Sequence, residues 1–105
     1  MNKFKLPKLV RDKIPEIIQS KGKSCLYHIA DKDEYLIRLK EKLHEEATEF
    51  TQQPCLEEAA DVIAVFVTLL EAYDLDLVEA VLYAVAKEKE RGAFIQKIIL
   101  DAVDE

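Results

Sequence analysis

Apolar residues recur at helical spacing through most of the chain, with few breaks between the periodic segments. Only two glycines and three prolines interrupt the pattern, which favours long helices. The first predicted helix lies between Asp12 and Gly22, and the second covers about residues 33–51. The third runs from Pro54 to about Tyr73, and the fourth covers about residues 77–91. We therefore expect an all-α antiparallel bundle of about four helices, in a single domain over residues 1–105.

Two apolar segments do not fit this helical pattern. Residues 24–30, SCLYHIA, are β-favouring, and the tail AFIQKIIL is apolar without clear periodicity. We expect a short two-stranded element between them, with a last helical turn as the alternative for the tail.

Residues that favour helix ends punctuate the helices. Asp12 is the expected N-cap of the first helix, and Gly22 is its expected C-cap. Asp31 and Asp33 both offer caps to the second helix. Pro54 is expected in the first turn of the third helix, where its missing N–H costs little.

One acidic residue of the second predicted helix occupies a core position. The apolar stripe of this helix consists of Leu36, Leu39, Leu43, Ala47 and Phe50. Glu46 falls inside the stripe, about 20° from Leu39, while Glu49 lies about 60° further round at its edge. An ionised carboxylate among core residues costs several kcal/mol unless it meets a cation.

The third predicted helix is apolar on both sides, which is typical of a central helix. Glu58 and Asp61 project from the start of one of these sides, three residues apart and therefore adjacent. The short connection makes the second and third helices antiparallel neighbours, which brings Glu49 towards Glu58. Oxygen ligands of this kind select hard ions, so we expect Glu46, Glu49, Glu58 and Asp61 to bind Mg²⁺ or Mn²⁺. Ordinary solvated acidic faces are the competing interpretation.

A basic pair on the fourth predicted helix complements these acids. Lys87 and Arg91 are four residues apart, on the face shared with Ala80 and Ala84. They are candidates for binding phosphate oxygens. Favourable interaction with the dipole at the helix C-terminus is the alternative.

Composition and charge exclude several classes of protein. A net charge of −6 lacks the electrostatic footprint of a nucleic-acid-binding protein. The longest uncharged run, residues 62–70, is too short to cross a membrane, and the basic N-terminus has no following apolar region typical of a signal peptide. Cys25 and Cys55 lack CxxC spacing and are expected to be reduced. We expect a soluble, cytoplasmic protein.

The acidic segments also carry a family resemblance. KLHEEATEF (42–50) followed by EEAADVIAVF (57–66) resembles the EExxE…ExxD signature of the all-α nucleoside triphosphate pyrophosphatases. That superfamily includes MazG-like proteins, dimeric dUTPases and phosphoribosyl-ATP pyrophosphatases. The opening KLVRDKIPEII and the closing KEKERGAFIQKIIL look like a MazG-related, phosphoribosyl-ATP pyrophosphohydrolase-like branch of house-cleaning enzymes.

The resemblance implies Mg²⁺-dependent hydrolysis of a nucleoside triphosphate to a monophosphate and pyrophosphate by a homodimer or homotetramer. It implies that the four acids named above bind Mg²⁺, and that Glu45 is a further ligand or the base for the attacking water. Lys87 and Arg91 would contact the triphosphate, and Arg11 and Lys13 are candidates for substrate contact. Only eight residues separate Glu49 from Glu58, so an insertion that might shape a base pocket is missing.

Three other functions compete with this one. Phosphoribosyl-ATP hydrolysis in histidine biosynthesis shares the acidic motif. A non-catalytic helical interaction module would keep the fold and use its surface for partners. A di-iron bundle requires ExxH on two helices, and the chain supplies only Glu41–His44.

Overall fold

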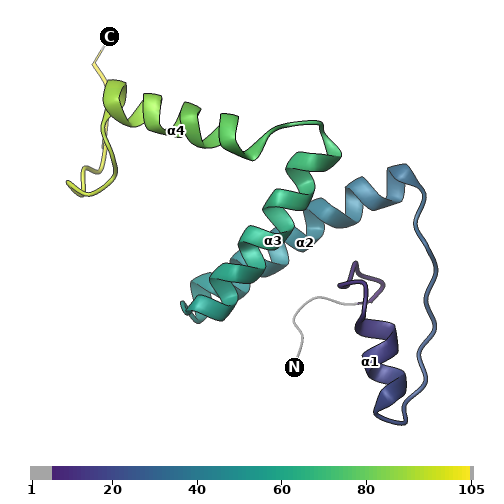
Figure 1. Ribbon diagram of the computed structural model, residues 1–105. Helices are drawn as coiled ribbons and strands as arrows, with labels where there is room; N and C mark the ends of the chain where they lie inside the picture. Colours follow the sequence, from purple (N-terminus) through teal and green to yellow (C-terminus); the bar gives the residue numbers. More distant parts are fainter. Residues whose placement is uncertain (1–5, 105) are drawn as a thin grey trace. The chain divides into compact units, whose positions relative to one another are not determined.

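The computed structural model describes residues 6–104, and within them it contains four helices and no strand (Figure 1). The helices are α1 (Ile14–Ser20), α2 (Lys32–Gln52), α3 (Leu56–Ala72) and α4 (Leu77–Arg91). The prediction of an all-α protein with four helices is therefore confirmed. The expected two-stranded element is not seen, because neither residues 24–30 nor the described part of the tail forms a strand.

The chain divides between Asp74 and Leu75 into two compact units. The first unit contains α1, α2 and α3, and the second contains α4 with the segment that follows it. The prediction of one domain over residues 1–105 stays a prediction. No helix in residues 6–104 combines the length and the apolar character needed to cross a membrane.

Both ends of α1 differ by one residue from the expectation, since the C-cap is Lys21 and Gly22 is the residue that follows it. The N-cap is Lys13 rather than Asp12, because a turn closed by the Ile14 N–H and the Arg11 carbonyl (3.0 Å) leads into the helix. At the other end, Gly22 has a φ of +78°, a conformation that glycine adopts without strain. The Gly22 and Lys23 N–H groups donate to carbonyls of the last turn, as in a Schellman motif.

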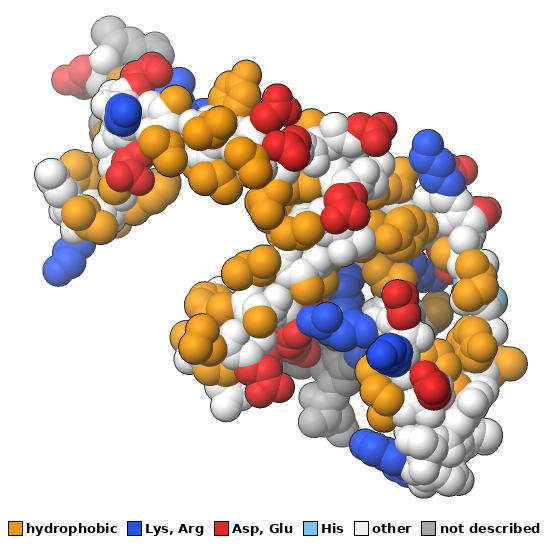
Figure 2. Space-filling model, viewed as in Figure 1, with side chains coloured by type: hydrophobic (Ala, Val, Ile, Leu, Met, Phe, Trp, Pro, Cys, Tyr) orange, Lys and Arg blue, Asp and Glu red, His pale blue; other side chains and the backbone are white. Residues whose placement is uncertain are grey.

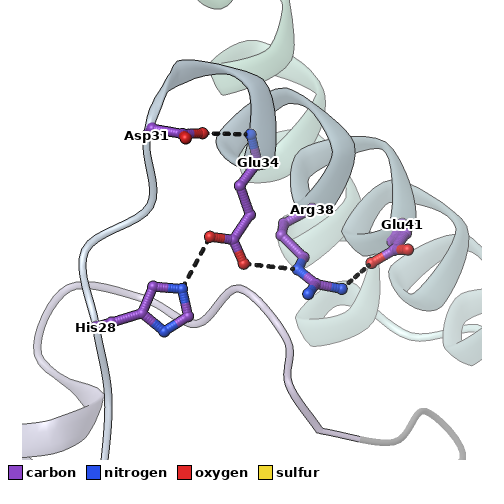
Figure 3. Close-up of polar contacts among 5 residues, drawn as sticks. All are labelled: His28, Asp31, Glu34, Arg38 and Glu41. Atoms are coloured by element: carbon purple, nitrogen blue, oxygen red, sulfur yellow. Dashed lines mark hydrogen bonds and ion pairs between the residues drawn. The ribbon is translucent and has the colours of Figure 1, made fainter.

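The N-terminus of α2 is held by a polar network that joins the helix to the preceding extended segment (Figure 3). The Asp31 carboxylate accepts from the Glu34 N–H at 2.9 Å, which confirms Asp31 as an N-cap. The Glu34 carboxylate in turn contacts His28 Nε2 at 2.8 Å and accepts from Arg38 Nε at 3.3 Å. Arg38 also donates to Glu41 at 3.2 Å, so Glu41 of the ExxH alternative belongs to this network.

α2 and α3 lie side by side and form the helical pair of the first unit (Figure 1). The chain reverses between them over residues 53–55, where Cys55 is extended and forms the N-cap of α3. Pro54 therefore precedes the helix instead of lying in its first turn, contrary to the prediction. Near the other end of the pair, the Lys40 ammonium of α2 lies 5.3 Å from the centre of the Tyr73 ring.

The side chains most deeply buried in the described chain are an unusual set. Leu39, at 1% exposure, is the one buried hydrophobic residue among residues 6–104. The two others that are buried are Glu45 and Glu46, both on α2. The other members of the predicted stripe are half-buried. Two of the three buried side chains in residues 6–104 are therefore carboxylates, which require partners to offset the cost of their burial.

Candidate metal centre

Three carboxylates from the two paired helices converge. Glu46 comes from α2, and Glu58 and Asp61 come from the first turns of α3. One oxygen atom from each of the three lies within 4.8 Å of the others. The structure thus brings together three of the four acids that the sequence predicts as ligands of one ion.

Two oxygens of this triad have no compensating contact. Glu46 is 6% exposed, and Oε2 of Glu46 and Oε2 of Glu58 are buried. Within the described residues, no hydrogen-bond donor reaches either atom. Buried carboxylate oxygens without a donor are costly, and a cation is the partner that removes that cost. The donor set is all oxygen, so the three side chains fit a hard divalent ion such as Mg²⁺ or Mn²⁺.

Glu49 lies close to this triad without belonging to it. Together with Gln52, Gln53 and Glu58 it lines an open pocket of about 390 Å³. Repulsion between its carboxylate and that of Glu46 raises the pKa of Glu46. The prediction that Glu49 is a metal ligand stays a prediction.

Burial raises the pKa of Glu46 above its ordinary value of 4.5. The contact with Lys42 acts in the opposite direction, and the neighbouring Glu49 adds to the increase. A proton therefore competes for the same carboxylate that a metal ion would use.

This raised pKa predicts how stability changes with pH. A carboxyl group whose pKa is higher in the folded state stabilises the fold below its unfolded pKa, and that contribution is lost as pH rises through the folded pKa. We expect Glu46→Gln to match the wild type near pH 4.5 and to become the more stable of the two towards pH 8. Urea unfolding of both proteins in EDTA at several pH values measures the difference. A difference that does not change with pH would contradict the pKa shift.

The acids of α2 also have basic partners. Lys42 Nζ lies 3.2 Å from Glu46 Oε1 and 3.5 Å from Glu45 Oε1. Lys8 Nζ donates to the same Glu45 oxygen at 3.2 Å. Glu45 is therefore a buried carboxylate between two lysines, outside the triad. Neither lysine was predicted from the sequence; the i, i+3 and i, i+4 spacing of Lys42 was the available signal for one of them.

A third cation contacts the triad directly. Arg11, from the turn before α1, donates through Nη2 to Asp61 Oδ1 at 2.7 Å. Arg11 was a candidate for substrate contact without an assigned role, and the structure pairs it with a predicted metal ligand. Lys13, the other candidate of that segment, is exposed at the N-cap of α1.

Charge is not balanced across this group of residues. The group contains five carboxylates but three cations, which are Lys8, Arg11 and Lys42. The carboxylates are Glu45, Glu46, Glu49, Glu58 and Asp61. When all five carboxylates are ionised, the group has a net charge of −2, which one divalent cation would neutralise.

Lys87 and Arg91 lie on α4, in the second unit. Both are exposed, and Arg91 Nε lies 3.9 Å from Glu90 Oε1 of the same helix. Their predicted contact with phosphate stays a prediction.

Comparison with known proteins found no family model, curated protein or solved structure that matches the chain.

Proposed function

We propose that the protein is a Mg²⁺-dependent nucleotide pyrophosphohydrolase of the MazG-like type. The observation that carries this proposal is the triad Glu46, Glu58 and Asp61, two of whose buried oxygens accept no hydrogen bond from the described residues. The resemblance of the acidic segments to the EExxE…ExxD signature supplies the reaction.

The chain's own residues have distinct tasks in this proposal. Glu46, Glu58 and Asp61, with Glu49 as the further predicted ligand, would hold Mg²⁺ or Mn²⁺. Such an ion would supply positive charge to compensate the phosphates and would activate a water molecule. Glu45 accepts the proton of that water during attack on the α-phosphorus. Lys13, Lys87 and Arg91 are the proposed additional contacts to the triphosphate.

The test is an assay with Mg²⁺ and a panel of standard and modified nucleoside triphosphates that also includes phosphoribosyl-ATP. We expect equal amounts of pyrophosphate and monophosphate, because cleavage occurs between the α- and β-phosphates. Release of inorganic phosphate alone would contradict this cleavage site. Preferential turnover of phosphoribosyl-ATP would favour the histidine-pathway alternative, and preference for modified nucleotides would favour a house-cleaning role.

We also propose that the chain functions as a homodimer or homotetramer. Large apolar side chains of α3 are exposed, among them Leu56, Ile63 and Phe66. Figure 2 shows hydrophobic side chains on the surface over this helix. Loss of that much apolar surface from water is the driving force for association, and an isologous dimer is the commonest solution. Sedimentation equilibrium that finds only monomer would contradict this.

The thiol groups support a cytoplasmic location for this enzyme. Both cysteines, Cys25 and Cys55, are free in the structure. Free thiols persist in a reducing compartment. Recovery of the native protein mainly from an oxidising compartment, with its cysteines in disulfides, would contradict it.

A further inference from the structure

Arg11 and Lys42 both contact acids of the candidate metal centre, but in different settings. Lys42 belongs to α2, its side chain is 15% exposed, and it bridges Glu45 and Glu46 of the same helix. Arg11 precedes α1, its side chain is 63% exposed, and Asp61 is 50 residues away in the sequence. Lys42 is thus part of the helical framework, whereas Arg11 lies at the solvent-facing rim.

The contacts of Arg11 leave most of its hydrogen-bonding capacity available. A guanidinium has five N–H donors. Among the described residues, one hydrogen bond from Arg11 is formed, to Asp61 Oδ1. Because the guanidinium fork matches phosphate oxygens in a bidentate way, Arg11 is suited to bind a polyphosphate beside the acids.

Arg11 and a divalent ion make opposing demands on Asp61. Both are positively charged, and both would bind the Asp61 carboxylate. Binding of the ion therefore weakens the attraction between Asp61 and the Arg11 guanidinium. A bound metal–polyphosphate complex offers Arg11 a new anionic partner at the same rim. Lys42 is less accessible to a polyphosphate, because its side chain is 15% exposed and both of its partners belong to its own helix.

We propose that Arg11 exchanges partners during substrate binding, leaving Asp61 when a divalent ion binds and then contacting the phosphates of the metal-bound nucleotide. This inference rests on the proposed function and assigns Arg11 as a substrate-binding residue. Arg11 would compensate the charge of Asp61 before the ion arrives and would recognise the polyphosphate afterwards.

The exchange predicts two effects of opposite sign in Arg11→Gln. Mn²⁺ alone should bind about 2- to 5-fold more tightly, because the ion no longer displaces an exposed ion pair. Inorganic tripolyphosphate in saturating Mg²⁺ should bind about 10-fold more weakly or worse, because a charged bidentate contact is lost. Isothermal titration calorimetry on the full chain measures both affinities without any turnover.

Two further variants sharpen the test. Arg11→Lys keeps the charge and loses the fork, so Mn²⁺ affinity should stay within about 2-fold of wild type while tripolyphosphate binding weakens. Lys23→Gln is the matched control, because Lys23 is exposed and forms no ion pair within the described residues. It should leave both affinities unchanged.

Two results would overturn the exchange. Weaker Mn²⁺ binding in Arg11→Gln would show that Arg11 holds Asp61 in position for the ion. Unchanged tripolyphosphate binding would show that Arg11 does not contact phosphate. Either result leaves the pyrophosphohydrolase proposal standing, since that proposal fails only if the wild type releases no pyrophosphate from any nucleotide in the panel.

Discussion

Replacing Glu46 by glutamine is expected to reduce pyrophosphate release by roughly 10²- to 10³-fold, the scale seen when a group that stabilises a transition state is removed. Glutamine has nearly the same shape but no negative charge. Glu46 is the buried member of the triad and carries one of its two oxygens without a donor. The substitution therefore removes the proposed anionic ligand that is least accessible to water.

The experiment compares steady-state pyrophosphate release by wild type, Glu46→Gln and Glu57→Gln at saturating Mg²⁺. Glu57 is the matched control because it lies in the first turn of α3, beside Glu58, and is exposed. Circular dichroism should show the same helix content in all three proteins. Wild-type turnover by Glu46→Gln would refute the assignment of Glu46 as a metal ligand.

The second large effect is stabilisation of the fold by the metal itself. An ion that binds only the folded chain raises the free energy of unfolding by about 2.7 kcal/mol at a concentration of 100 times its Kd. For a domain of this size the melting temperature should rise by roughly 10 °C. The physical reason is that the ion neutralises the triad carboxylates, two of whose buried oxygens accept no hydrogen bond from the described residues.

Differential scanning fluorimetry with increasing Mg²⁺ or Mn²⁺ measures this effect. Asp61→Asn should lose most of the shift, because Asp61 is one of the three converging carboxylates. Asp33→Asn provides the control, since Asp33 is an exposed acid in the first turn of α2. A shift that survives Asp61→Asn would place the ion elsewhere, and no shift in the wild type would favour the non-catalytic module.

The helices illustrate how far local signals reach. α4 covers the residues expected from its periodicity, because Asp76 caps its start through the Glu79 N–H and Gly92 ends it with a positive φ. These signals act over a few residues, so they can be read from the sequence. The start of α1 was predicted wrongly, because a turn involving Arg11 and Ile14 competes with the cap at Asp12.

The candidate site divides in a similar way. Glu46 could be singled out because a carboxylate inside an apolar stripe is visible in the helical repeat of α2 alone. Glu58 and Asp61 could be paired because they are three residues apart on α3. The contact of buried Glu45 with Lys8 could not be foreseen, since Lys8 lies 37 residues earlier in the chain.

By itself, the sequence determined the four helices, the pairing of α2 with α3 and the candidate acids Glu46, Glu49, Glu58 and Asp61. Helical periodicity and short loops are local properties of the chain, so they can be recognised without the structure. Only the tertiary structure decided which acids converge: the packing of α2 on α3 brings Glu58 and Asp61 to Glu46 and leaves Glu49 beside them. It also decided that Arg11 meets Asp61, a contact across 50 residues that no local pattern encodes. Electrostatic contacts depend on distances between side chains, and those distances exist only once the helices have packed.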